Sequence, residues 1–397
     1  MQFQFHSSID EINALAWDSL WPTAYPFTRH AFLAALEHSG SIDSPQQQGS
    51  GWIPRHLSVT ENEELLAVMP LFIKQHSYGE YVFDWSWADA YARNGLDYYP
   101  KLVNAIPFTP ATGPRIAFHS RLHETAKSAV AEQMLKAIEE FASTHVLSGF
   151  HSLFPSAEQH SNFQSRGFAL RHGSQFHWFN QNYQNFDQFL ETFSSRKRKN
   201  VKKERRVAQS HGYTICMQPA SDISEEDWHT FYLLYQRTYL KRSGHGGYLG
   251  QDFFLQLAHS MPTQVLMASV KDEQELIAGA LFFKDEDTLY GRYWGTRIEL
   301  DQLHFEACYY QGIEYAIANK LKRFDPGAQG EHKIQRGFTP VFTASFHQLF
   351  HADFQAAVTH FVQQEFPHTR HYVQECRTSL PFKEGCDQVR ADILMPT

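Results

Sequence analysis

The pattern of hydrophobic and polar residues predicts helices and short strands in a mixed order. In the first part it predicts helices over 8–19, 28–38 and 121–141, a hairpin over 55–74, and strands over 81–87 and 148–154. In the second part it predicts helices over 185–209, 227–240, 304–321 and 353–365, and strands over 264–271, 276–284, 288–296 and 323–325. This order indicates an α+β fold rather than the strict alternation of a dinucleotide-binding fold.

Two segments of the chain repeat each other. Residues 58–72 read SVTENEELLAVMPLF, and residues 269–283 read SVKDEQELIAGALFF. The tetrapeptide YGEY at 78–81 is echoed by YGRY at 290–293. A repeat at half-chain spacing indicates two copies of one domain rather than a solenoid. We therefore expect a first domain over 1–171 and a second over 172–397, each a mixed sheet flanked by helices.

The composition is that of an ordinary globular protein. Of the 397 residues, 42% are hydrophobic and 20% are charged. We expect no membrane span and no signal peptide, and hence a cytoplasmic protein. The four cysteines, at 216, 308, 376 and 386, lack a CxxC spacing, and the histidines form no HExxH motif. We expect reduced thiols and no metal site.

Positive charge is concentrated in one segment. The net charge is −8, yet residues 196–206 read RKRKNVKKERR. Like charges at helical spacing repel unless an anion spans them, so this segment predicts a phosphate-bearing partner. The candidate carrier-binding residues are Arg196, Arg198, Lys199 and Lys203. The alternative is a solvated helix whose charges only keep the protein soluble.

Two further segments combine turn residues with titratable groups. Residues 325–340 read DPGAQGEHKIQRGFTP and place an acid, a base and cations within one glycine-rich loop. In the first half, residues 74–81 and 98–101 cluster aromatic, charged and turn residues that suit a substrate carboxylate or phosphate. A polar surface loop and aromatic core packing are the respective alternatives. His304 and Cys308 share a helix face, as a nucleophilic pair would, although packing explains such a thiol more often.

Several of these segments together resemble a known family. They are the hairpin ending in LIAGALFF, the strand YGRYWGT, the helix HFEACYYQGIEYAI and the loop GAQGEHKIQRGFTP. They are similar to the Fem-like branch of the GNAT acyltransferase superfamily, the FemAB-like N-acyltransferases of peptidoglycan metabolism. HSYGEYVFDWSWADAY, YYPKL and PFTPATGPR in the first half resemble the same family.

The resemblance implies tandem GNAT domains that transfer an acyl or aminoacyl group to an amine. The donor would be an aminoacyl-tRNA or an acyl-CoA, with no covalently bound cofactor. The acceptor would be a peptidoglycan precursor or another small amine. GNAT enzymes carry a [QR]xxGx[GA] turn, of which Arg292 and Gly295 match the first half and Arg297 breaks the second. The long helical hairpin of the tRNA-dependent relatives is also missing, so both donors stay open.

The residue roles follow from this expected reaction. We expect Glu306 or His332 as the base, Lys333 and Arg336 to steady negative charge, and Tyr309 or Tyr310 to serve the leaving group. The carrier would contact the cations of residues 196–206 together with Arg292, Gly295 and Arg336. The expected substrate-binding residues are Lys74, His76, Glu80, Tyr81, Asp84, Tyr99, Lys101, Arg115, Gln329 and Glu331. The alternative function is non-catalytic: RNA binding, or recognition of cell-wall peptides by a degenerate GNAT pair.

Overall fold

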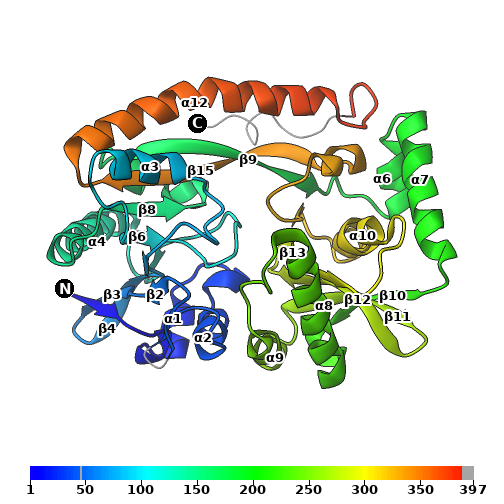
Figure 1. Ribbon diagram of the computed structural model, residues 1–397, viewed down its shortest axis with the longest axis horizontal. Coiled ribbons are helices and arrows are strands. Elements are labelled where there is room, and N and C mark those ends of the chain that lie inside the picture. Colours follow the sequence, from blue (N-terminus) through cyan, green and yellow to red (C-terminus); the bar gives the residue numbers. More distant parts are fainter. Residues whose placement is uncertain (45–46, 387–397) are drawn as a thin grey trace. The chain divides into compact units, whose positions relative to one another are not determined.

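A computed structural model describes residues 1–44 and 47–386 of the chain (Figure 1). The chain divides into two compact units. Unit 1 contains Met1–Gly173 and Thr343–Thr369, and unit 2 contains Ser174–Phe342 and the chain from Arg370. A single domain boundary was predicted from the sequence, after residue 171. In the structure the chain passes from one unit to the other three times, after residues 173, 342 and 369. No helix in the described part has the length and apolar character that crossing a membrane requires.

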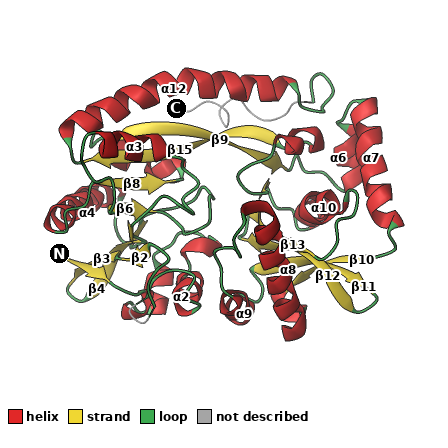
Figure 2. Ribbon diagram, viewed as in Figure 1, coloured by secondary structure: helices red, strands yellow, loops and turns green. Residues whose placement is uncertain are grey.

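Unit 1 contains strands of two sheets with helices beside them (Figure 2). One set of strands has the order β1 (Gln2–His6), β3 (His56–Glu61), β4 (Glu64–Met69) and β7 (Ala117–Phe118). A second set has the order β8 (Gly149–Leu153), β6 (Lys101–Asn104), β5 (Phe72–Lys74) and β2 (Trp52–Pro54). Its helices are α1 (Ala14–Ser19), α2 (His30–His38), α3 (Trp85–Arg93), α4 (Glu124–Thr144) and α5 (His160–Gln164). The buried face of α4, with Met134 and Ile138, packs on Leu57 and Phe150 of the sheet.

Unit 2 repeats this arrangement with longer strands. Its order is β10 (Thr214–Pro219), β11 (Val265–Asp272), β12 (Glu275–Lys284), β13 (Thr288–Thr296), β14 (Arg323–Asp325) and then β9 (Ala169–Phe179). Its helices include α6 (Phe186–Glu191), α7 (Ser195–Ser210), α8 (Glu225–Ser243), α9 (Gln251–Ser260), α10 (Leu303–Phe305) and α11 (Gln311–Ala318). A π-helix, η5 (Glu306–Tyr310), joins α10 to α11, and a 3-10 helix, η6 (Glu331–Arg336), precedes β15 (Thr339–Leu349). The last helix is α12 (Ala352–Thr378).

The two hairpins predicted to be copies share an irregularity. In unit 1, Val59 pairs with Ala67 but Thr60 pairs with Leu65, which leaves one residue as a bulge. In unit 2, Val270 pairs with Ala278 but Lys271 pairs with Leu276. These four pairs correspond at one constant offset along the chain. A bulge is a specific local feature, and its recurrence at equivalent positions supports the predicted duplication.

Some sequence-based predictions are wrong. The strand expected at 81–87 is a loop followed by α3, so YGEY at 78–81 is not the structural counterpart of YGRY, which lies in β13. The helix expected over 185–209 is broken between α6 and α7, where the chain turns at Phe193 and Ser194. The polar segment after 365 continues α12 to Thr378, and residues 387–397 lie outside the described part. Strands β1, β2, β6, β7, β9, β10 and β15 were not predicted.

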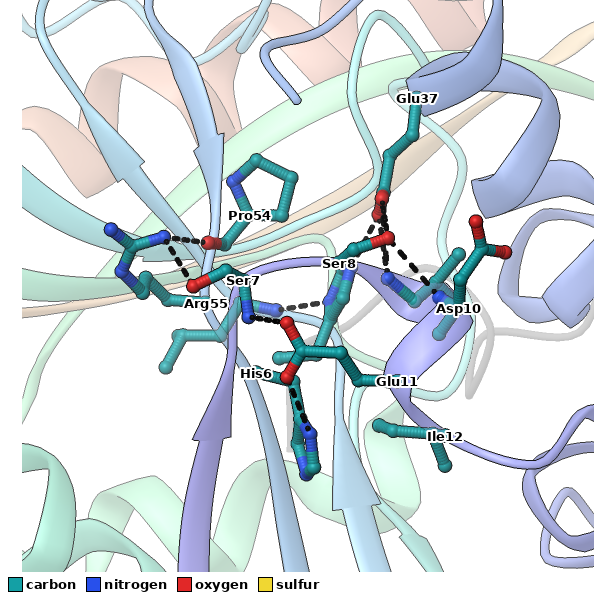
Figure 3. Close-up of polar contacts among 12 residues, drawn as sticks. His6, Ser7, Ser8, Asp10, Glu11, Ile12, Glu37, Pro54 and Arg55 are labelled. Atoms are coloured by element: carbon teal, nitrogen blue, oxygen red, sulfur yellow. Dashed lines mark hydrogen bonds and ion pairs between the residues drawn. The ribbon is translucent and has the colours of Figure 1, made fainter. Parts of the chain in front are cut away.

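A polar network in unit 1 ties the start of the chain to α2 and β3 (Figure 3). Glu37, only 2% exposed, accepts hydrogen bonds from Ser8 Oγ at 2.6 Å and from Ile9 N at 3.0 Å, and it contacts His56 Nε2 at 3.1 Å. Glu11 contacts His6 at 3.2 Å in the same network, but its side chain is 43% exposed. One carboxylate is therefore buried and the other is largely solvated.

We expect Glu37→Ala to lower the free energy of unfolding by about 3 kcal/mol, because three buried polar groups lose their partner. Urea denaturation followed by circular dichroism measures this change. Glu11→Ala is the matched control, with an expected loss below about 1 kcal/mol because its carboxylate is exposed. Equal losses for the two variants would contradict the importance given to Glu37.

Candidate active site

Strands β13 and β14 of unit 2 run side by side and then separate. They pair in parallel only from Thr288 with Arg323 to Tyr290 with Asp325. Strand β14 ends there, while β13 continues to Thr296 beside β12. A register shift in the β12–β13 pairing leaves Arg292 between the paired residues Gly291 and Tyr293. We call the place where the two strands separate, between residues 291–296 and 326–330, the fork.

A buried ion pair lies at the start of the fork. Arg292 Nη2 is 2.7 Å from Asp325 Oδ2, and these side chains are 2% and 1% exposed. Asp325 Oδ1 also accepts a hydrogen bond from the Gly327 N–H at 2.9 Å. Burial raises the pKa of the Asp325 carboxyl, but the Arg292 charge outweighs burial and holds this pKa below its usual value. His177 of β9 lies 3.7 Å from the same carboxylate. The fork therefore begins at the ionised Asp325 carboxylate, which is held by Arg292 and by the Gly327 N–H.

Lys333 enters the fork from η6. Gly330 and Gly337 flank η6 with φ angles of 115° and 87°, a region that favours glycine. The Lys333 side chain is buried, and its Nζ donates a hydrogen bond to the Gly327 carbonyl at 2.7 Å. Burial lowers the pKa of Lys333 to about 8, although Asp325 acts in the opposite direction. The ammonium is thus charged at neutral pH yet close to titration.

His332 and Tyr309 form a hydrogen-bonded pair beside Lys333. The Tyr309 hydroxyl lies 2.8 Å from His332 Nε2, and it donates there when the ring carries its proton on Nδ1. Burial, assisted by the nearby cations Lys333 and Arg336, lowers the pKa of His332 to about 4. Burial also raises the pKa of Tyr309. At neutral pH the pair is an uncharged imidazole and an uncharged phenol. The His332 ring packs against Phe305 and Tyr309, which shields it from water although the residue as a whole is exposed.

The predicted residues Glu306, Tyr310 and Arg336 are bound to α7. Arg205 contacts Glu306 through two hydrogen bonds of 2.8 and 3.0 Å. Glu204 accepts hydrogen bonds from Tyr310 and from Arg336, the latter at 2.9 and 3.1 Å. Because both Glu306 oxygens are held by a guanidinium, we do not assign it the role of base.

Other predicted site residues take structural positions. A side chain at Gly295 would meet the backbone of α8, with Tyr235 N at 2.5 Å, so close packing of β13 on this helix accounts for the glycine. Burial strongly raises the pKa of the Cys308 thiol and lowers that of His304 to about 3, which does not favour a thiolate–imidazole pair. Gln329 is exposed, and Glu331 accepts a hydrogen bond from Tyr372 at 2.9 Å.

The exposed face of α7 carries the predicted cations. Arg196, Lys199 and Lys203 are exposed, and Arg198 is half-buried. Lys197 contacts Gln335 of η6, and Lys202 lies 2.8 Å from Asp187. One face of α7 therefore exposes cations to solvent. On its other face, Glu204 and Arg205 form ion pairs with Arg336 and Glu306.

The predicted substrate-binding residues of the first half gather in unit 1. Lys101 Nζ lies 2.9 Å from Glu80, 2.5 Å from Asp84 and 3.0 Å from Ser77 Oγ, all buried. Burial raises the pKa of Glu80 to about 7 and lowers that of Lys74 to about 7. Nearby, Tyr99 shares a 2.7 Å hydrogen bond with Ser77, Tyr81 has a φ of 60°, and burial lowers the pKa of His76. The structure brings these residues together around Lys101 and Ser77.

The position in unit 1 that corresponds to the fork is filled by the chain itself. Strand β6 ends at Asn104 beside β8, and residues 105–116, nearly all buried, lead to β7. Asn104 Nδ2 donates to the Pro70 carbonyl at 2.7 Å, and Arg115 Nε donates to the Leu153 carbonyl at 2.7 Å. Arg115, predicted to bind substrate, is fully buried on main-chain carbonyls. The candidate active site is therefore the fork of unit 2.

Sequence reasoning gave no role to several residues of this site. Asp325 and His177 are far apart in the chain, and only the β14–β9 pairing brings them together. Glu204 and Arg205 were grouped with the other charges of the basic helix. One signal was present: Glu204 is the single acid within RKRKNVKKERR, which marks its position as different. Within the described residues, no group of three or more His, Cys, Asp or Glu side chains is placed to hold a metal ion.

We expect the difference in unfolding free energy between Lys333→Met and the wild type to change with pH. The native pKa of about 8 lies below the usual 10.5. Between these values the unfolded wild type binds more protons than the native state, so its stability rises with pH. The difference in unfolding free energy should change by about 3 kcal/mol in favour of the wild type from pH 8 to 10.5. Urea titrations measure it.

The exposed Lys322→Met serves as the control for this titration, and its gap to the wild type should stay constant over the same pH range. A constant gap for Lys333→Met as well would show that the native pKa of Lys333 is not lowered.

Comparisons with known proteins identify a family and similar folds. The FemAB-like family model, described as peptidoglycan biosynthesis/recognition, matches residues 8–384. The structure is similar to the crystal structure of FemX, with a TM-score of 0.50 and 12% identity over 90% of this chain and 100% of that chain. A conserved protein of unknown function from Bacteroides thetaiotaomicron VPI-5482 gives a TM-score of 0.50 and 9% identity, covering 87% of this chain and 99% of that chain.

L-PGS from Bacillus licheniformis is also similar, with a TM-score of 0.47 and 14% identity, covering 78% of this chain and 89% of that chain. No curated protein matches the sequence. At these identities the structural likenesses concern the fold alone. The family match confirms the predicted resemblance, and with it the predicted tandem α+β fold of the acyltransferase type.

Proposed function

Because the chain belongs to the FemAB-like family and is thus an enzyme of the N-acyltransferase class, we propose that the fork of unit 2 is its active site. In this proposal it transfers an aminoacyl group from an aminoacyl-tRNA to an amine of a peptidoglycan precursor. The observation that carries the proposal is the buried Lys333 ammonium at the fork, next to the uncharged His332–Tyr309 pair. A cation that can stabilise an oxyanion and an uncharged imidazole that can accept a proton thus come from adjacent residues, Lys333 and His332.

In the proposed reaction the acceptor amine attacks the carbonyl carbon of the ester. The new C–N bond forms while the carbonyl oxygen becomes an oxyanion, and the Lys333 ammonium stabilises that charge in a site of low polarity. His332 takes the proton that the amine nitrogen loses at Nδ1, in the tautomer whose Nε2–H donates to the Tyr309 hydroxyl oxygen, and this hydrogen bond orients the ring. The C–O bond to the carrier then breaks, and the leaving oxygen recovers the proton from His332.

The carrier in this proposal is recognised by charge. The exposed cations of α7 lie on the helix that holds η5 and η6 through Glu204 and Arg205. A polyanion on these cations would therefore sit on the element that supports the catalytic residues. The incomplete phosphate-binding turn gives no support to an acyl-CoA donor, and the row of exposed cations on α7 favours a tRNA, the longer polyanion.

We expect Lys333→Met to lower kcat by about 10²- to 10³-fold, the usual loss for one oxyanion donor. His332→Gln should cost about 10²-fold or more because the proton acceptor is gone. Single-turnover transfer of a labelled aminoacyl group to a muropeptide measures both. Lys322→Met, an exposed lysine of the same unit, should retain wild-type turnover. Wild-type rates in the first two variants would remove the fork from the mechanism.

The dependence of kcat/KM on pH should follow Lys333 and His332. Activity requires an uncharged imidazole and a charged ammonium, so it should rise as pH passes about 4 and fall as pH passes about 8. The descending limb should move to higher pH in Lys333→Arg, since a guanidinium keeps its proton. A descending limb that is the same in this variant would assign it to another group.

A further inference from the structure

Helix α7 connects directly to the loop that carries the catalytic residues. Glu204 binds Arg336 through hydrogen bonds of 2.9 and 3.1 Å, and the Arg336 side chain is 7% exposed. Arg336 Nη1 in turn donates to the main-chain carbonyl of His332 at 2.6 Å. A single side chain therefore separates α7 from the backbone of His332. Lys197 adds a second connection to η6 through Gln335.

The neighbouring residue, Arg205, connects α7 to the helix on the other side of the site. Its guanidinium binds Glu306 at 2.8 and 3.0 Å and Glu314 at 2.7 and 2.8 Å, and it lies 4.5 Å from the centre of the Phe186 ring. Glu306 begins the π-helix that contains Tyr309. π-Helical turns are local departures that need external support and often occur at functional sites. Arg205 supplies such support here.

The outer face of the same helix is under electrostatic repulsion. Arg196, Lys199, Lys203 and Arg206 are exposed at spacings of three and four residues, where like charges destabilise a helix. A bound polyanion would relieve this repulsion and hold α7 in its helical form. Because Arg205 holds η5 and Glu204 holds η6, a ligand that stabilises α7 also stabilises these two elements.

From these contacts we infer that α7 couples carrier binding to catalysis, with Glu204 and Arg205 as positioning residues for His332 and Tyr309. The inference rests on the proposed function for the identity of the reaction. Coupling between two sites is reciprocal. A muropeptide amine bound at the fork therefore increases the affinity of α7 for a polyanion by the same factor by which the polyanion increases affinity for the amine.

Adjacent arginines provide a matched pair of variants. Arg205→Met removes the inner contacts, and Arg206→Met removes an exposed charge from the next position. We expect Arg205→Met to lower kcat about 10-fold or more with the KM for the carrier nearly unchanged, because a displaced catalytic group slows the chemical step. Arg206→Met should raise the KM for the carrier with kcat retained, and the increase should be largest at low salt because one phosphate contact is lost. Arg205→Lys should recover part of the kcat.

A second measurement does not depend on turnover. In the full-length protein with ¹³C-labelled histidine, a tRNA acceptor-stem minihelix should shift the His332 resonance, assigned from His332→Gln. It should shift this resonance in Arg206→Met at saturating minihelix, but not in Arg205→Met or Glu204→Gln. Circular dichroism confirms that each variant is folded.

The outcomes separate this inference from the proposed function. A shift that depends on Arg205, in a protein that transfers no aminoacyl group, would support the coupling and refute the reaction. Active protein whose His332 shift is the same in Arg205→Met and Arg206→Met would refute the coupling alone. Absence of a minihelix-induced shift in the wild type would also overturn it.

Discussion

The buried pair of Arg292 and Asp325 is the constraint on which the site depends. Where two neighbouring strands of a sheet separate, main-chain groups lose their partners, and buried groups without partners are costly. Here side chains replace those partners: Asp325 accepts from the Gly327 N–H, Arg292 donates to the Gly291 carbonyl, and Lys333 donates to the Gly327 carbonyl. Side chains of β13, β14 and η6 thus satisfy the main chain where the strands separate. Lys333 remains an ammonium in a buried place because Asp325 is ionised beside it.

The two units use one framework with different side chains. Their hairpins share a bulge, and each unit has a parallel strand pair at the same rank in its sheet. In unit 1, His151 of β8 contacts His347 of β15 at 2.8 Å, where unit 2 places Asp325 against His177. Burial lowers the pKa of His151 to about 3, so this position is uncharged in unit 1. The backbone arrangement is common to both, whereas the ion pair at the fork belongs to unit 2.

The sequence revealed the parts of the fold that depend on local patterns. The hairpins, α4, α8 and the meander β11–β13 were predicted because their residues alternate or recur at helical spacing. Strands β1, β2, β6, β7, β9, β10 and β15 were missed, since they are short or pair with strands far away in the chain. In the site, loop 325–340 was predicted from its composition, and it does hold His332 and Lys333 at the fork. The pairing of Glu306 with Arg205 was not predictable, because no pattern within one segment reports which carboxylate a distant guanidinium will reach.

The buried stretch between β6 and β7 distinguishes one copy of the duplicated domain from the other. Residues 105–116 occupy in unit 1 the position that corresponds to the fork of unit 2, so the two copies differ where the strands separate. The ancestral likeness should then persist where both copies need the same backbone, as in the bulged hairpins, and fade around the openings. The bulged hairpins thus record the common origin of the two units, and the segments around the strand ends record their divergence.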